Sequence, residues 1–82
     1  MKDKARFVEV WDSTNGRDSA IVSDILKNAF DVRYKRFSTG YTYYRLRATK
    51  KEVKVLAKQL ATLGYYSTLT DNRYFHVITR AN

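Results

Sequence analysis

The chain has 82 residues, of which 44% are apolar and 29% charged, a composition that predicts one folded domain over residues 1–82 rather than a disordered segment. The absence of cysteine excludes disulfide bonds and thiolate metal sites, and the net charge of +8 favours an acidic partner. Because no run of about 18 apolar residues and no apolar signal-peptide core occurs, we expect a soluble, cytoplasmic protein with no membrane partner.

The first two predicted elements are a strand and a helix. Residues 4–12 alternate apolar and polar side chains around Val8 and Val10 and are rich in β-branched and aromatic residues, which predicts a strand. Residues 17–30 carry apolar side chains at helical spacing, and Asp18 suits the positive end of a helix dipole. We therefore expect a helix after a short polar loop.

A hairpin and a second helix follow. Residues 32–38 and 41–48 are rich in aromatic and β-branched side chains and flank a glycine turn, so they predict two paired strands. Thr49 and Glu52 have the spacing of a capping box, in which each side chain accepts a hydrogen bond from the other residue's backbone N–H. The apolar stripe that follows predicts a helix that Gly64 ends.

The last part of the chain leaves two alternatives open. Residues 65–70 and 73–80 are both strand-like, and they form either a closing hairpin or one strand preceded by an irregular segment. The element order is β-α-β-β-α-β, with or without an extra C-terminal strand. It predicts an α+β ferredoxin-like sandwich, in which two helices cover one face of an antiparallel sheet and the first and third strands lie at its centre.

The other face of that sheet is expected to be open. Successive side chains of a strand point to opposite faces, and we expect Val32 and Tyr34 to point toward the helices in the second strand. The residues expected on the open face are Phe7, Glu9, Trp11, Arg33, Lys35, Phe37, Tyr41, Tyr43, Arg45 and Arg47.

Aromatic side chains interleaved with arginine and lysine suit single-stranded nucleic acid, RNA or DNA. Flat rings stack on unpaired bases while cations neutralise phosphates, and a double helix does not expose its bases to such a surface. The predicted binding residues are Trp11, Tyr41 and Tyr43 for stacking and Arg33, Lys35, Arg45 and Arg47 for phosphates, with Phe37 as a further aromatic contact.

Residues 39–46 resemble the third-strand signature of RNA-recognition motifs, a basic residue followed by glycine, an aromatic, a small residue, a second aromatic and a β-branched residue. Gly40, Tyr41 and Tyr43 match it in register, whereas Thr39 replaces the basic residue and Tyr44 the usual valine. The resemblance implies that Tyr41 and Tyr43 are the stacking rings of that strand.

A protein-binding role is the main alternative. The aromatic residues and arginines could anchor a protein partner or a homodimer, as in small inhibitors of phage or mobile-element type that engage an acidic protein. Residues 32–58 carry a balance of +8, against −1 for residues 1–31 and +1 for residues 59–82. Part of that charge comes from lysines of the second helix, which are also typical of a solvated helix face.

We expect no enzymatic activity, cofactor or metal. His76 lies in a strand without catalytic or metal-ligand neighbours in the sequence, so it is predicted to be an ordinary sheet residue. The strand end Val10-Trp11-Asp12 is similar to that of Cas2-type ferredoxin-like nucleases, which implies a metal held by Asp12 in a dimer. Because no second carboxylate supports it, Asp12 is expected to form a turn at the strand end or to be a capping residue instead.

Overall fold

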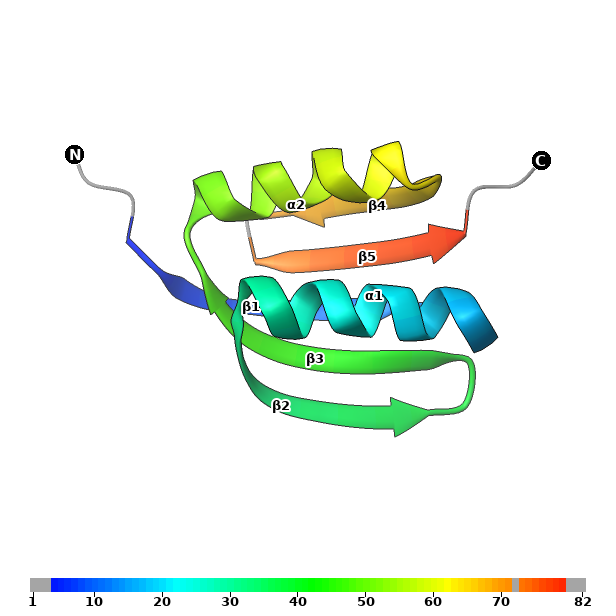
Figure 1. Ribbon diagram of the computed structural model, residues 1–82. Coiled ribbons are helices and arrows are strands. Elements are labelled where there is room, and N and C mark those ends of the chain that lie inside the picture. The colour runs from blue at the N-terminus through cyan, green and yellow to red at the C-terminus, as the bar shows by residue number, and fades with distance from the viewer. Residues whose placement is uncertain (1–3, 72, 80–82) are drawn as a thin grey trace.

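The computed structural model describes residues 4–71 and 73–79, which form two helices and five strands (Figure 1). In chain order the elements are β1 (Arg6–Asp12), α1 (Gly16–Ala29), β2 (Asp31–Ser38), β3 (Tyr41–Ala48), α2 (Lys50–Thr62), β4 (Tyr65–Thr70) and β5 (Tyr74–Thr79). The predicted elements are present, and of the two alternatives for the last part of the chain the hairpin is observed. Position 72 and Arg80, which belong to the predicted turn and last strand, lie outside the described residues.

The five strands form one mixed sheet in the order β2-β3-β1-β5-β4. β1 pairs antiparallel with β3 but parallel with β5, so the expectation of a purely antiparallel sheet is wrong. The hairpin places β5 inside the sheet and leaves β4 at its edge. β5 suits the inner position because Phe75 and Val77 are completely buried, whereas three of the six residues of β4 are serine or threonine.

Both helices cover the same face of the sheet, and one hydrophobic core lies between the two layers (Figure 1). In β1 and β3 every second side chain is buried in this core, as the alternation predicts. The buried apolar residues are Val8, Val10, Tyr44, Leu46, Ala48, Tyr65, Phe75 and Val77 from the sheet and Val22, Leu26, Val53, Leu56 and Leu60 from the helices.

The second helix begins and ends where its sequence signals predict. Thr49 Oγ1 accepts a hydrogen bond from the Glu52 N–H at 3.1 Å, and Glu52 Oε1 accepts from the Thr49 N–H at 2.8 Å. Gly64, at φ +95°, follows the helix in the left-handed region that glycine favours. Neither helix of the described residues combines the length and the apolar character needed to cross a membrane.

A β-bulge in β2 changes which of its side chains face the helices. Val32 pairs with Leu46, but the next pair joins Tyr34 to Arg45, so Arg33 is an extra residue in the strand. Because two residues of β2 there oppose one of β3, the alternation is inverted beyond this point. Tyr34, predicted to face the helices, therefore lies on the other side.

The same bulge moves two predicted binding residues away from the open face. Lys35 pairs with the buried Tyr44, and its Nζ donates a hydrogen bond to Ser23 Oγ of α1 at 3.1 Å. Phe37 pairs with the buried Thr42 and so points to the helix side, where its side chain is 83% exposed beyond the cover of α1. The prediction that Lys35 and Phe37 belong to the open face is wrong.

Candidate functional site

The face of the sheet opposite the helices carries most of the molecule's exposed rings and arginines. It consists of the outward set of side chains from all five strands, and we call it the open face. Its described residues are Phe7, Glu9 and Trp11 of β1, Asp31, Tyr34, Arg36 and Ser38 of β2, Tyr41, Tyr43, Arg45 and Arg47 of β3, Tyr66, Thr68 and Thr70 of β4, and Tyr74 and His76 of β5.

Five rings form a continuous row across four strands of the open face. Trp11 lies at the centre, with its ring centroid 5.3 Å from that of Tyr43 in β3 and 5.1 Å from that of His76 in β5. Tyr74, 5.9 Å from Trp11, and Tyr34, 6.1 Å from Tyr43, complete what we call the aromatic row. These separations are those of favourable ring pairs, so each ring helps to hold its neighbour in place.

Arginine side chains lie over the rings of the open face. A guanidinium carbon is within 6 Å of a ring centroid in five pairs: Arg36 with Tyr43 (5.7 Å), Arg45 with Tyr34 (5.9 Å) and with Phe7 (5.8 Å), Arg47 with Phe7 (5.1 Å), and Arg73 with Tyr74 (5.9 Å). Contacts of this kind are attractive and orient the cation along the ring surface. Positive charge is therefore interleaved with the aromatic row.

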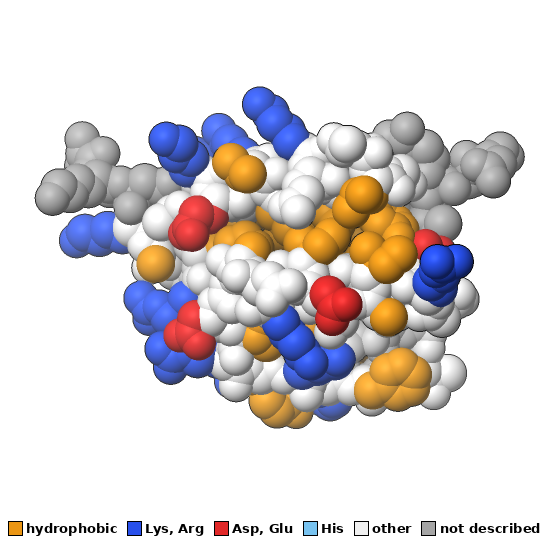
Figure 2. Space-filling view, in the orientation of Figure 1, with side chains coloured by type: hydrophobic (Ala, Val, Ile, Leu, Met, Phe, Trp, Pro, Cys, Tyr) orange, Lys and Arg blue, Asp and Glu red, His pale blue; other side chains and the backbone are white. Residues whose placement is uncertain are grey.

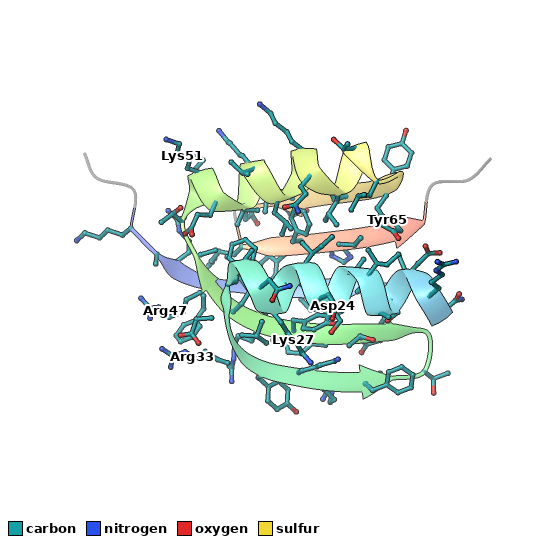
Figure 3. All side chains as sticks on the ribbon, in the orientation of Figure 1. Asp24, Lys27, Arg33, Arg47, Lys51 and Tyr65 are labelled. Carbon is teal, nitrogen blue, oxygen red and sulfur yellow. The ribbon has the colours of Figure 1, made fainter. Side chains whose placement is uncertain are left out.

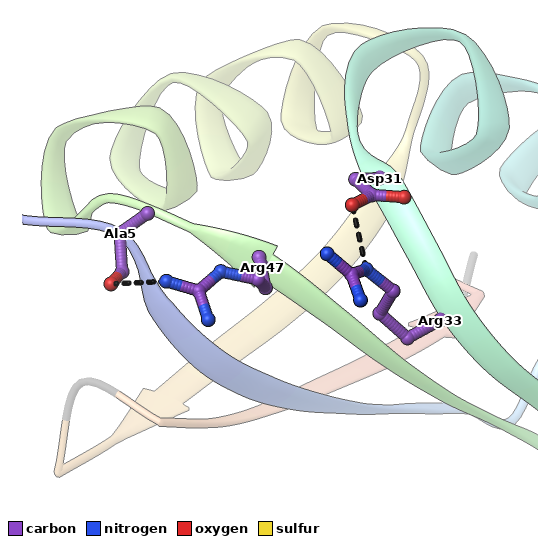
Figure 4. Close-up of polar contacts among 4 residues, drawn as sticks. All are labelled: Ala5, Asp31, Arg33 and Arg47. Atoms are coloured by element: carbon purple, nitrogen blue, oxygen red, sulfur yellow. Dashed lines mark hydrogen bonds and ion pairs between the residues drawn. The ribbon is translucent and has the colours of Figure 1, made fainter.

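Arg33 and Arg47 lie at the end of the sheet where β2 begins and β3 ends (Figure 3, Figure 4). Arg33 Nε is 2.6 Å from Asp31 Oδ2, and the pair is exposed. Arg47 Nη2 donates a hydrogen bond to the carbonyl of Ala5 at 3.3 Å. Because Asp31 offsets its charge, Arg33 contributes less to the positive field than Arg47 does.

Two acidic residues belong to the open face: Asp31 lies at the start of β2, whereas Glu9 lies within the aromatic region. The Tyr43 hydroxyl donates a hydrogen bond to Glu9 Oε1. Burial of the hydroxyl, together with its hydrogen bond to the Glu9 carboxylate, raises the pKa of Tyr43 to about 12. The pair fixes the Tyr43 ring beside Trp11.

A hollow of about 330 Å³ opens beside this pair. Three rings, two guanidinium groups and one carboxylate surround it. Its lining residues are Glu9, Trp11, Tyr34, Arg36, Tyr43 and Arg45. Such a lining offers flat apolar surfaces together with hydrogen-bond donors and an acceptor.

The structure brings only part of the predicted site together. Trp11, Tyr43 and Arg45 surround the hollow, and Arg47 lies over Phe7 nearby. Tyr41 shares the open face, but it lies beside the β2–β3 turn opposite Ser38, away from the aromatic row. Arg33 is the bulge residue, and Lys35 and Phe37 are on the helix side.

Four residues of the site were missed. Tyr34 and Arg36 reach the open face only because of the bulge, for which the sequence carries no clear signal. Tyr74 and His76 alternate with the buried Phe75 and Val77, so the pattern that identified the outward residues of β1 would also have identified these two. The open-face prediction covered the first three strands and did not extend to residues 73–80.

The lysines of α2 lie on the other side of the molecule. Figure 2 shows the helix side, with Lys and Arg along the α2 edge and hydrophobic side chains between the two helices. Lys51 projects from α2 away from the sheet (Figure 3). The charge of residues 32–58 is thus divided, with the arginines of β3 on the open face and the lysines with the helices.

Asp12 points into the core from the end of β1, and its side chain is 0% exposed. Its Oδ1 accepts hydrogen bonds from the Thr14 N–H at 2.9 Å and the Thr14 hydroxyl at 2.6 Å, as in an Asx turn. Burial raises the pKa of Asp12. Within residues 4–71 and 73–79 no three His, Cys, Asp or Glu side chains gather as a metal site would require.

No protein-family model, curated protein or solved structure matches the chain.

Proposed function

We propose that the protein binds single-stranded nucleic acid across its open face. The observation that carries the proposal is the aromatic row, in which five rings from four strands lie side by side and stay partly exposed. Each unpaired base has two flat faces, so any of the bases can stack on such rings, at about 1–3 kcal/mol per base. Single strands fit this surface, whereas the bases of a duplex are already stacked on one another.

The arginines supply the second requirement, which is charge for the phosphates. Arg36, Arg45 and Arg47 lie over rings of the open face, where a strand whose bases stack would bring its backbone close to them. Each phosphate contact releases counterions, so the affinity should fall steeply with salt. The role is binding without catalysis, since the Asp12 carboxylate on which a nuclease would depend is buried in the core.

The arrangement of the strands is consistent with this function. We regard the domain as a ferredoxin-like sandwich widened by one strand, in which β3 lies beside β1 as it does in RNA-recognition motifs. Tyr43 takes the position of a stacking ring, consistent with the resemblance of residues 39–46 to the third-strand signature of that family. His76 and Tyr74, from the inserted β5, enlarge the stacking surface.

Nuclear magnetic resonance titration with a short thymidine oligonucleotide at low salt tests the proposal. We expect the indole N–H of Trp11 and the amides of β1, β3 and β5 to shift, while the amides of α2 stay in place. A matched duplex should produce much smaller shifts on the open face. The proposal fails if the single strand leaves the open-face signals unmoved or if the shifts are confined to the lysine face of α2.

A second candidate function is supported by the helix side. A groove of about 270 Å³ lies between the helices, lined by apolar side chains that include Phe30, Val55 and Leu56, and Lys51 stands at its rim. An acidic protein segment with apolar anchors would complement this groove. Shifts confined to the groove on addition of an acidic amphipathic peptide would favour that function over the first.

A further inference from the structure

The position of Glu9 is unusual for a surface that binds phosphates. In the register of the sheet it lies between Arg45 of β3 and Tyr74 of β5, in the midst of rings and cations. A carboxylate there repels phosphate at close range, so on its own it weakens binding of the backbone. The same carboxylate can read a base, because bases carry N–H donors on their edges.

The contacts of Glu9 leave it able to accept further hydrogen bonds. Its Oε1 accepts from the Tyr43 hydroxyl, and an ionised carboxylate offers about four acceptor positions on its two oxygens. Arg45, its direct neighbour in β3, is turned toward the rings of Phe7 and Tyr34. The ion pair found among residues 4–71 and 73–79 is that of Asp31 with Arg33, so no cation there occupies the Glu9 carboxylate.

Guanine is the base whose edges fit this arrangement. Its Watson–Crick edge presents N1–H and the 2-amino group side by side, two donors that one carboxylate can accept together. Uracil and thymine present one N–H between two carbonyl oxygens, and adenine and cytosine pair their amino group with an acceptor nitrogen. The O6 and N7 acceptors of guanine are the usual partners of an arginine, and Arg36 and Arg45 line the same hollow.

We propose that the hollow beside Glu9 selects a guanine from the bound strand. The base stacks on the rings that line the hollow, its Watson–Crick edge donates to the Glu9 carboxylate, and an arginine donates to its O6 and N7. This inference rests on the proposed function and adds base specificity to it. The phosphates of the strand lie away from the Glu9 carboxylate, along the arginines that line the hollow.

Fluorescence anisotropy with labelled thymidine nonamers tests the selection. One nonamer contains thymidine alone, and the others carry guanine, adenine, cytosine or hypoxanthine at the central position. A single guanine in a thymidine background avoids guanine quadruplexes. We expect the guanine nonamer to bind about 5- to 150-fold more tightly than thymidine alone, the range of one bidentate base contact. Hypoxanthine, which lacks the 2-amino group, should lose most of this preference.

Glu9→Gln is the decisive variant. The amide offers one acceptor oxygen and a donor, so it cannot accept both guanine donors, and the guanine preference should disappear. The Kd values of the variant for the guanine and thymidine nonamers should therefore become equal, and the ratio of these two values is the measured quantity. Asp24→Asn on α1 makes the same change in net charge on the helix side and should keep the preference (Figure 3).

The possible results separate the two proposals. Equal binding of all nonamers to the wild-type protein overturns the guanine inference and leaves the proposed function in place. A guanine preference that survives Glu9→Gln in a variant with a native circular dichroism spectrum also overturns it. Failure of every nonamer to bind the wild-type protein overturns the proposed function itself.

Discussion

The ring of Trp11 in β1 stacks on that of His76 in β5, with centroids 5.1 Å apart and planes inclined by 16°. The contact depends on the parallel pairing of the two strands, which places these residues directly opposite each other. The strand that follows α2 directly, β4, is instead displaced to the edge of the sheet. Because β5 lies beside β1, the aromatic row continues from Trp11 of β1 to Tyr74 and His76 of β5.

Trp11→Ala should weaken binding of a thymidine nonamer. Trp11 contacts three other rings of the aromatic row, so its loss removes one stacking surface and loosens its neighbours. Loss of one base stack corresponds to about 1–3 kcal/mol, or about a 5- to 150-fold higher Kd by anisotropy. Phe37→Ala removes an aromatic ring that is 83% exposed on the helix side and should leave the Kd unchanged. Equal losses in the two variants would contradict the assignment of the open face.

Arg45→Ala should lower the salt dependence of binding. On a single strand a phosphate contact contributes about 0.7 unit to the slope of log K against log salt concentration, so its removal should reduce the slope by about that amount. Lys35→Ala removes the same unit of charge from a side chain that is bonded to Ser23 on the helix side, and it should leave the slope intact. The comparison requires Kd values at four or more salt concentrations. A slope that falls for Lys35→Ala and not for Arg45→Ala would place the phosphate path on the other side of the sheet.

Much of the fold could be predicted because its local signals agree with its packing. In β1 and β3 the alternation holds along the whole strand, so Trp11, Tyr43 and Arg45 were assigned to the correct face. The start of α2 was predictable because the capping box of Thr49 and Glu52 is a local device that requires no tertiary contact.

The remaining features depend on relationships between distant strands. The bulge at Arg33 is a mismatch between β2 and β3. The side chains of β2 alone do not predict that two of its residues lie opposite one residue of β3. This one extra residue places Tyr34 and Arg36 on the open face and Lys35 and Phe37 on the helix side. The place of β5 likewise depends on its pairing with β1, a strand far away in the sequence, which leaves Phe75 and Val77 completely buried.

Thr49→Ala should destabilise the protein by about 1 kcal/mol, within the range of about 0.5–2 kcal/mol found for loss of an N-cap. The Thr49 hydroxyl accepts from the Glu52 N–H, which would have no partner within the first turn of α2 after the substitution. Thr62→Ala is the matched control at the other end of the same helix, where the hydroxyl donates to the Lys58 carbonyl. Its effect should be close to zero, because that carbonyl is exposed and alanine favours a helix. Urea unfolding measures both, and equal effects would argue against the capping box.

Asp12→Asn should alter the pH dependence of stability. Burial raises the pKa of Asp12 above its ordinary value of 3.8, so the folded state holds its proton at pH values where the unfolded chain has lost it. The free energy of unfolding therefore falls as the pH rises from 3.8 through the folded-state pKa. Asparagine keeps an oxygen that can accept from Thr14 but never ionises, so it avoids this loss.

Urea unfolding of the wild-type protein and Asp12→Asn at several pH values between about 3 and 7 measures this effect. The difference in unfolding free energy, Asp12→Asn minus wild type, should increase with pH across the series. Phe37→Ala, which removes a side chain that does not titrate, should differ from the wild type by the same amount at every pH. A constant difference for Asp12→Asn as well would mean that the carboxyl reaches solvent or a counter-charge in the folded protein. In that case the Asp12 carboxylate would be accessible to a cation, and the result would favour the nuclease-like alternative.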